Sequence, residues 1–262
     1  MTSHHLRLLT AGVLIVLLAG LIFFAPSTVQ AGALGVLCLA ALYEFWTMFW
    51  SDWTWLKVSG LIVAVPMALA PGLGWNQGLL LLICFWLFCL ATTFWGRGTG
   101  ESSWTDIGIV LAGLIYIPGS LGLLCFMSTM ELVFVLAAVA VSDTAAFYGG
   151  SRWGKHKLCP SISPQKSWEG SGCGLAACII LSLGVGLIWG QGPWFSWIGI
   201  GVALNAAAQL GDLFESALKR GLGVKDSGGL LPGHGGVLDR VDSLLLAVPV
   251  YTALGSVYPL WG

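Results

Sequence analysis

The chain has 262 residues, of which 57% are hydrophobic and 9% are charged, and its formal net charge is −1. Soluble domains carry roughly a quarter of charged residues, so this composition and a mean hydropathy of +0.88 exclude an ordinary soluble protein and predict a polytopic membrane protein. The sequence has no basic tail and no basic patch interleaved with aromatic residues, so no nucleic-acid partner is expected. Its seven Cys residues lack paired metal-ligand spacing, and neither disulfides nor a zinc site are expected.

Apolar segments follow one another along the chain, most of them near the length of about 20 residues that crosses a bilayer. The nine predicted spans are roughly residues 7–25, 28–50, 56–71, 77–95, 105–127, 129–149, 170–190, 194–218 and 237–259. The third is short, and the fifth is interrupted around Pro118-Gly119. The predicted fold class is therefore an all-α polytopic integral membrane protein with about nine transmembrane helices.

The charges of the loops predict the orientation of these spans. If the N-terminus is cytoplasmic, all 11 Lys and Arg residues fall in cytoplasmic segments and the opposite loops contain none. This bias follows the positive-inside rule, so we expect a cytoplasmic N-terminus and a C-terminus outside. Residues 1–31 could instead be a cleaved signal peptide ending at Val29-Gln30-Ala31, although the apolar run from Leu8 to Ala25 is long for one.

The predicted spans form two regions, residues 1–127 with about five spans and a catalytic region, residues 128–262. The second region contains two long cytoplasmic loops, residues 149–170 and 219–236, which combine Gly with Lys, Arg and His. Glycine lets backbone N–H groups approach an anion, and basic side chains supply a positive field. The loops are thus typical of a phosphate site, although no Walker or GxGxxG motif is present and membrane topology alone would also explain their charges.

Two acidic residues lie inside the cytoplasmic ends of predicted helices. Asp212 is seven residues before Lys219, which places it roughly 10 Å inside the helix end, and Asp143 lies at a similar depth. Ionisable groups at such depth are costly and are often functional. Four polar residues of the second helix share one face through i, i+3, i+4 and i+7 spacing: Asp212, Glu215, Ser216 and Lys219.

Asp239 and Asp242 are three residues apart at the start of the last span, so both can point the same way. Carboxylates that converge from several helix ends suit a hard divalent cation, and Mg²⁺ fits best. The helix dipole alone could favour acids at this helix start, but it does not explain Asp212. Lys219 can be an ordinary ion pair of Glu215, and Asp226 and His234 can be turn residues; for His234, phosphate contact or proton transfer is an equal alternative.

The charged C-terminal segment reads Ser216-x-x-Lys219-Arg220-x4-Lys225-Asp226, then Leu231-Pro232-x-His234-Gly235-Gly236-x-x-Asp239-Arg240-x-Asp242. It resembles the signature of the phosphatidate cytidylyltransferases, also called CDP-diacylglycerol synthases, with every position filled. Residues 163–170 look like the family's SPKKTWEG, with Gln165 and Ser167 as departures. Residues 143–158 are similar to its DTGAYFxGRxFGKHKL, with Ala145 replacing a Gly and Ser151 replacing a frequent Arg, so that Arg152 stands one place later.

The resemblance implies an enzyme that joins CTP to phosphatidic acid and releases CDP-diacylglycerol and pyrophosphate. It implies nine helices per subunit, a homodimer in the inner (plasma) membrane, an active site on the cytoplasmic face, and Mg²⁺ with a second cation nearby. The matching metal and catalytic residues are Asp212, Asp239, Asp242 and, for catalysis, Lys219. The expected substrate-binding residues are Ser216, Arg220, Lys225, Asp226, His234, Gly235, Gly236, Arg240, Lys166 and Asp143, the last also an auxiliary metal ligand.

The expected reaction is attack of the lipid phosphate on the α-phosphorus of CTP, which depends mainly on positioning and charge stabilisation. One alternative is a CTP-dependent kinase of a polyprenol-type lipid alcohol, which would transfer the γ-phosphate and release CDP; the complete C-terminal signature argues against it. A secondary transporter is a more remote alternative. The sequence shows no internal repeat, and its charges gather at one face of the predicted bundle.

Overall fold

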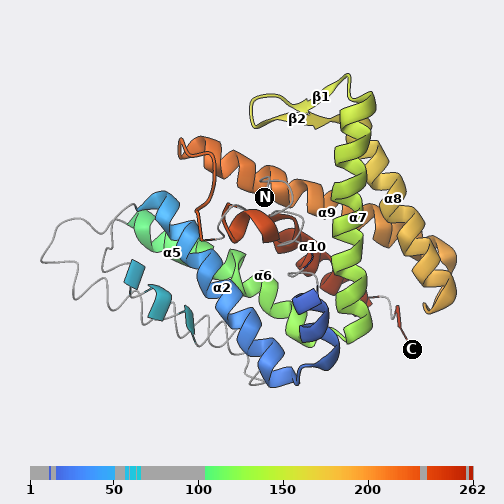
Figure 1. Ribbon diagram of the computed structural model, residues 1–262, viewed down its shortest axis with the longest axis horizontal. Coiled ribbons are helices and arrows are strands. Elements are labelled where there is room, and N and C mark those ends of the chain that lie inside the picture. Colours follow the sequence, from blue (N-terminus) through green and yellow to red (C-terminus); the bar gives the residue numbers. More distant parts are fainter. Residues whose placement is uncertain are drawn as a thin grey trace, which may run out of the picture. The chain divides into compact units, whose positions relative to one another are not determined.

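A computed structural model of the chain is mostly helical (Figure 1). It describes residues 12, 16–50, 57–58, 60–62, 64–65, 104–230, 235–257 and 260–261. The chain divides into two compact units. Unit 1 comprises Met1–Thr129 and Asp226–Asp239, and unit 2 comprises Met130–Lys225 and Arg240–Gly262.

Six helical segments of the described part of the chain are long and apolar enough to cross a membrane. They are Ser27–Phe49, Asp106–Phe126, Thr129–Trp153, Trp168–Ile188, Trp194–Gly221 and Leu238–Val257, and each matches a predicted span. Of the first predicted span, residues 16–24 are helical; most of the third and all of the fourth lie outside the described residues. The helical membrane class is confirmed, while the count of nine and the orientation of the termini stay predictions.

Unit 1 contains α2 (Ser27–Phe49), which packs against α5 (Trp104–Tyr116), α6 (Pro118–Leu121) and the 3₁₀ helix η3 (Gly122–Phe126). The predicted interruption near Pro118 is confirmed, since α5 ends two residues before α6 begins. Proline has no N–H to continue the hydrogen bonds of α5, and its ring suits the first turn of a new helix.

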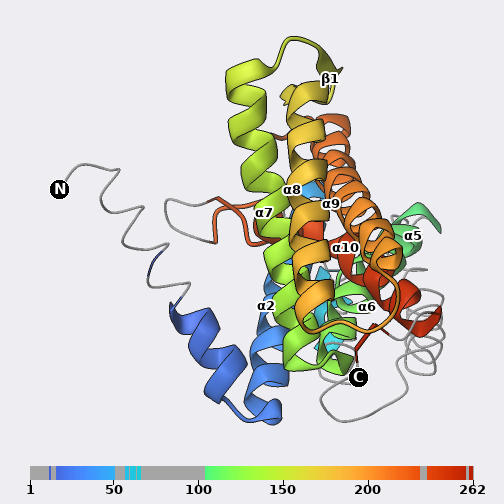
Figure 2. The ribbon, with the colours of Figure 1, turned by 90° about the vertical axis from the view of Figure 1, so that its right-hand side faces the viewer.

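Unit 2 contains α7 (Thr129–Trp153), α8 (Trp168–Ile188), α9 (Trp194–Gly221) and α10 (Leu238–Val257) from Arg240 onward. Helices α8 and α9 pack side by side (Figure 2). The prediction of a purely α-helical chain with a loop over residues 149–170 was wrong in detail. Helix α7 continues to Trp153, and an antiparallel hairpin of β1 (Lys157–Cys159) and β2 (Ser163–Ser167) precedes α8. Strands this short carry almost no alternating pattern, so the sequence does not reveal them.

A network of polar side chains links α7, α8 and α9 inside unit 2. Ser142 donates from its hydroxyl to Asn205 Oδ1 at 2.8 Å, and Gln209 Nε2 donates to the same oxygen at 2.9 Å. Ser171 Oγ donates to Gln209 Oε1 at 2.6 Å. Polar groups among membrane helices need such partners because lipid offers none. Its member on α7, Ser142, is the residue directly before Asp143.

Helices α8 and α9 approach closely where the indole of Trp197 lies on glycines of α8. Trp197 is 1% exposed, and a Cβ at Gly186 would overlap its ring. At Gly184, two residues earlier, nothing lies within 4 Å of an added Cβ. The Trp197 ring can therefore lie against α8 because residue 186 has no side chain.

We expect Gly186→Ala to destabilise unit 2 by about 1–3 kcal/mol, because the new methyl group forces Trp197 from its site. Thermal unfolding of the purified protein in detergent measures the change. Gly184→Ala on the same helix is the matched control and should unfold at or slightly above the wild-type temperature, because alanine favours the helix. Equal unfolding temperatures for the two variants would contradict this packing.

Candidate active site

Helix α10 approaches α9 closely at Gly211, one residue before Asp212. A Cβ on Gly211 would lie 2.6 Å from the backbone oxygen of Asp242 and 3.3 Å from Cα of Ser243. Glycine lets the two helix backbones meet at this point. The carboxylates of Asp212 and Asp242 thereby come into the same part of unit 2.

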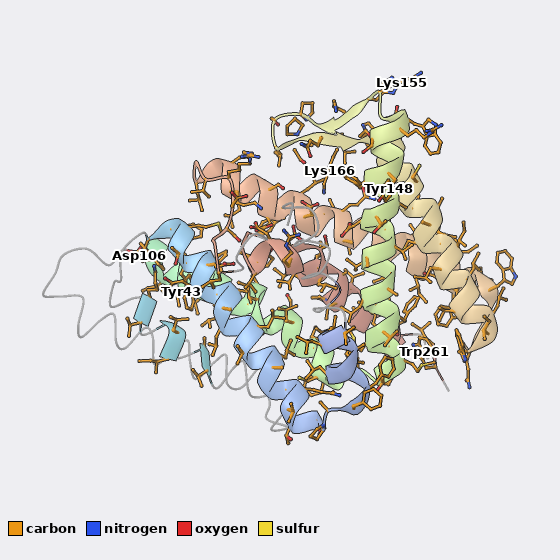
Figure 3. All side chains as sticks on the ribbon, in the orientation of Figure 1. Tyr43, Asp106, Tyr148, Lys155, Lys166 and Trp261 are labelled. Atoms are coloured by element: carbon orange, nitrogen blue, oxygen red, sulfur yellow. The ribbon has the colours of Figure 1, made fainter. Side chains whose placement is uncertain are left out.

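Asp212 is contacted from the hairpin and from its own helix. Lys166 of β2 places Nζ 2.7 Å from Asp212 Oδ2, and Ser216 Oγ donates to Oδ1 at 3.3 Å. The Lys166 side chain extends from the hairpin toward α9 (Figure 3). Side-chain exposure is 24% for Lys166 and 32% for Asp212, so the ion pair is accessible. Two predicted site residues from distant parts of the sequence are thus in direct contact.

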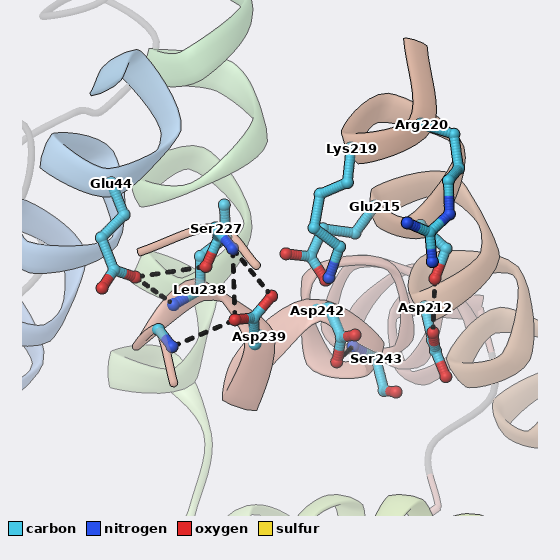
Figure 4. A network of polar contacts seen from close by, with 12 residues as sticks. Glu44, Asp212, Glu215, Lys219, Arg220, Ser227, Leu238, Asp239, Asp242 and Ser243 are labelled. Carbon is cyan, nitrogen blue, oxygen red and sulfur yellow. Dashed lines mark hydrogen bonds and ion pairs between the residues drawn. The ribbon is translucent and has the colours of Figure 1, made fainter. Parts of the chain in front are cut away.

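Two further carboxylates of unit 2 lie near Asp212. Asp143 of α7 accepts a hydrogen bond from the Ser243 hydroxyl and interacts electrostatically with Asp212 and Lys166. Asp242 interacts with Asp212 and Asp143 and lies within hydrogen-bonding reach of Glu215 (Figure 4). Two carboxylates in contact repel each other unless a proton or a cation lies between them. The structure therefore brings predicted acidic residues from three helices into one negatively charged cluster.

The basic residues at the end of α9 have partners within unit 2. Lys219 Nζ lies 3.1 Å from Oε2 of Glu215, one turn earlier. The interpretation of Lys219 as a helix ion pair is confirmed, and this contact directs its charge at the fully buried Glu215. Arg220 Nε donates to the Ile162 backbone oxygen in the hairpin turn at 3.3 Å.

For the other predicted substrate-binding residues, the structure gives their exposure and their place in the chain. Lys225, Asp226 and Arg240 are exposed, whereas Gly235 and Gly236 lie in the segment before α10. Residues 231–234 lie outside the described part of the chain. The predicted role of His234 therefore stays a prediction.

The segment around Lys166 also organises the hairpin. Ser167 caps α8 by accepting a hydrogen bond from the Gly170 N–H at 3.1 Å. The Glu169 carboxylate accepts from the backbone N–H of Lys155 and His156 at 3.1 and 3.2 Å, and lies 2.6 Å from His156 Nδ1. These contacts hold the strand that presents Lys166. Thr has the same hydroxyl and would also cap the helix, somewhat less well than Ser.

In unit 1, Asp239 accepts from the Ser227 N–H, 3.3 Å from each oxygen, and from the Gly236 N–H at 3.0 Å. Sequence reasoning missed Glu44 of α2, whose carboxylate binds the Leu238 N–H at 2.9 Å and other donors of the same loop (Figure 4). The available signal was a lone carboxylate within an apolar span, the same signal that identified Asp212. Backbone N–H groups expected to bind phosphate are occupied here by the protein's own carboxylates.

The described residues hold no group of three or more His, Cys, Asp or Glu side chains arranged to bind a metal ion. The chemistry of the acidic cluster nevertheless suits a hard cation, since its donors are carboxylate oxygens. The predicted magnesium site and second cation stay predictions.

The membrane-length helices define an integral membrane protein, and carboxylates of unit 2 are paired there with Lys166 and Lys219. Residues 5–258 match the cytidylyltransferase family. The chain is similar to a phosphatidate cytidylyltransferase of Brucella suis biovar 1 (strain 1330), at 37% identity over 212 residues, which are 79% of this chain and 73% of the relative. It is also similar to a phosphatidate cytidylyltransferase of Staphylococcus aureus (strain COL), at 33% identity over 253 residues, 89% of this chain and 94% of the relative. The chain belongs to the cytidylyltransferase family, which confirms the resemblance and the nucleotidyltransferase class.

We expect Ser167→Ala to destabilise the protein by about 0.5–2 kcal/mol, because the first turn of α8 loses its cap. Ser167→Thr keeps the acceptor oxygen and should lose less stability than Ser167→Ala. Thermal unfolding in detergent compares the three proteins. If the alanine and threonine variants behaved alike, the cap would contribute nothing measurable.

Proposed function

We propose that the chain transfers the cytidylyl group of CTP to phosphatidic acid, giving CDP-diacylglycerol and pyrophosphate for phospholipid synthesis. The observation that carries this proposal is the meeting of Asp143, Asp212 and Asp242 with Lys166 in unit 2. Family membership supplies the reaction class, and the names of the relatives supply the lipid substrate. Helices long enough to cross a membrane suit a lipid acceptor.

In the proposed reaction, a phosphate oxygen of the lipid attacks the α-phosphorus of CTP. A new P–O bond forms, the bond from the α-phosphorus to the bridging oxygen breaks, and pyrophosphate leaves with that oxygen. The attacking phosphate is already anionic near neutral pH, so no strong protein base is required. The main difficulty is to bring two polyanions together, and positioned cationic side chains such as Lys166 reduce their repulsion.

We propose that Asp212 and Asp242 hold Mg²⁺, with Asp143 as an auxiliary ligand and a second cation nearby. We include Asp239 among these ligands because it lies three residues before Asp242 on α10 and matches the family signature. The excess of carboxylates in the cluster and the contact of Asp242 with Glu215 support a cation at this place. When bound, Mg²⁺ would neutralise phosphate charge and polarise the reacting group.

For the membrane arrangement, we propose nine spans, a cytoplasmic N-terminus and a C-terminus outside. The active site would then lie on the cytoplasmic face of the inner (plasma) membrane, in a homodimer. The support is the distribution of Lys and Arg, all of which fall on one side in this arrangement.

Fusions to alkaline phosphatase, which is active only outside the cytoplasm, test the arrangement. We expect activity for a fusion after Gly262 and none for a fusion after Gly221, since the last span crosses between them. Two fusions of equal activity, with comparable expression, would overturn the proposed orientation of α10.

Asp212→Asn tests the acidic cluster. We expect kcat/KM to fall on the order of 100-fold, because a ligand-type carboxylate is lost and Lys166 loses its partner. Asp106→Asn in α5 is the control, since it also neutralises a carboxylate in a helix but lies outside the proposed site. Near-normal turnover of a folded Asp212→Asn protein would remove the role assigned to Asp212.

The proposed reaction is distinguished from its alternatives with CTP labelled at the α- or γ-phosphate. Purified protein in detergent receives phosphatidic acid and Mg²⁺, and in parallel a polyprenol. We expect α-label in the lipid and γ-label in pyrophosphate. Transfer of γ-label to the alcohol would indicate a kinase, and absence of lipid labelling by folded protein would reopen the transporter interpretation.

A further inference from the structure

Glu44 of α2 is a buried carboxylate that the proposed reaction does not use directly. Glu44 is 1% exposed, and its carboxylate accepts hydrogen bonds from a segment that is distant in sequence. Its Oε2 accepts from the Leu238 N–H at 2.9 Å and from Ser227 Oγ at 3.4 Å, and its Oε1 accepts from the Leu230 N–H at 3.3 Å. These donors belong to residues 226–230 and 235–238, which we call the signature loop. Glu44 therefore binds the signature loop at both of its ends.

The partners of Glu44 are suited to a buried negative charge. Leu238 is the first residue of α10, and the first N–H groups of a helix have no acceptor within the helix. The helix dipole adds partial positive charge at this end. Glu44 thus caps α10 from a different helix, which offsets the cost of removing the carboxylate from water.

The signature loop is shaped to enclose this carboxylate. A Cβ on Gly228 would lie 2.5 Å from Glu44 Oε1, and a Cβ on Gly236 would lie 2.7 Å from Glu44 Oε2. Glycine at both positions therefore leaves room for the Glu44 carboxylate. The packing of Glu44 alone thus explains glycine at these two positions, without a bound phosphate.

The same loop also orients Asp239. The Ser227 backbone N–H donates to both Asp239 oxygens, while the Ser227 hydroxyl donates to Glu44. The Gly236 N–H donates to Asp239 at 3.0 Å, and Gly236 is the residue that packs against Glu44. The position of the Asp239 carboxylate is thus coupled to Glu44 through two loop residues.

We propose that Glu44 is a positioning residue of the cytidylyltransferase site, which fixes the signature loop and through it the orientation of Asp239. This inference rests on the proposed function, in which Asp239 serves the cation. Glu44 would act through the loop that binds Asp239, and not on the cation itself. A purely structural position between helices would be filled more favourably by an apolar side chain, whereas a carboxylate can bind several N–H groups at once.

The test compares Glu44→Gln and Glu44→Asp with the wild type, each as full-length protein in detergent. Gln keeps one acceptor oxygen but turns an NH₂ group toward loop donors, so at least one hydrogen bond becomes a repulsive contact. Amide hydrogen exchange at Leu230 and Leu238 reports the loop independently of catalysis, and we expect it to accelerate at least about tenfold in Glu44→Gln. We also expect kcat/KM to fall about 10–100-fold and the half-saturating Mg²⁺ concentration to rise about tenfold. Glu44→Asp retains the charge and should recover part of each loss.

Glu131→Gln is the matched control. Glu131 is another carboxylate in a membrane-length helix, α7, and accepts from the Tyr251 hydroxyl at 3.3 Å. We expect it to leave the exchange of the loop amides and the Mg²⁺ dependence at wild-type values. A change of equal size in this variant would mean that loss of any carboxylate in a membrane-length helix has this effect, and would overturn the inference.

The outcomes separate this inference from the proposed function. If wild-type protein forms no CDP-diacylglycerol, the proposed function fails, and the positioning role fails with it even where the loop exchange changes as expected. If wild type is active, unchanged loop exchange or unchanged Mg²⁺ dependence in folded Glu44→Gln overturns the inference alone. If Glu44→Gln does not fold, Ser227→Ala replaces it, because this variant removes one donor to Glu44 and leaves the carboxylate charge. A smaller change in the same direction in loop-amide exchange and in Mg²⁺ dependence supports the inference. Wild-type values of both contradict it.

Discussion

A carboxylate removed from water among membrane helices must meet hydrogen-bond donors or a cation, and this constraint organises the polar part of the chain. Glu44 meets backbone N–H groups of the signature loop. Asp212 meets Lys166 of the hairpin, and Glu215 meets Lys219 one turn away. The hairpin and the signature loop are therefore each attached to a helix through an acidic side chain.

The two kinds of partner have different consequences. The donors of Glu44 are backbone groups, which stay where the chain holds them, and Glu44 is fully buried. Lys166 is a flexible side chain that is 24% exposed, so it can turn from Asp212 to another anion with little change of the backbone. Fixed donors suit a residue that holds a loop, and an exchangeable partner suits a residue that takes part in chemistry. This difference is why Asp212 belongs to the proposed reaction and Glu44 to its support.

Local patterns allowed much of this structure to be predicted. Apolar runs identified the six membrane-length helices of the described residues, Pro118 predicted the break after α5, and i, i+4 spacing predicted the contact of Ser216 with Asp212. The hairpin was missed because its strands have three and five residues. Glu44 was missed because its partners lie 183 to 194 residues away. No spacing rule connects positions that far apart, and only the folded chain shows which carboxylate meets which loop.

Asp239 and Asp242 show what spacing alone leaves open, because it does not reveal the partners of each residue. Residues three apart on a helix differ by about 60° in direction, so the prediction that both point the same way was reasonable. In the structure, Asp239 is bound by the Ser227 and Gly236 N–H groups of unit 1, whereas Asp242 interacts with Asp212 and Glu215 in unit 2. Helix α10 begins in unit 1 and continues in unit 2, so its first turn serves both. A change in the loop before α10 therefore acts directly on Asp239, because that loop supplies the N–H groups that its carboxylate accepts.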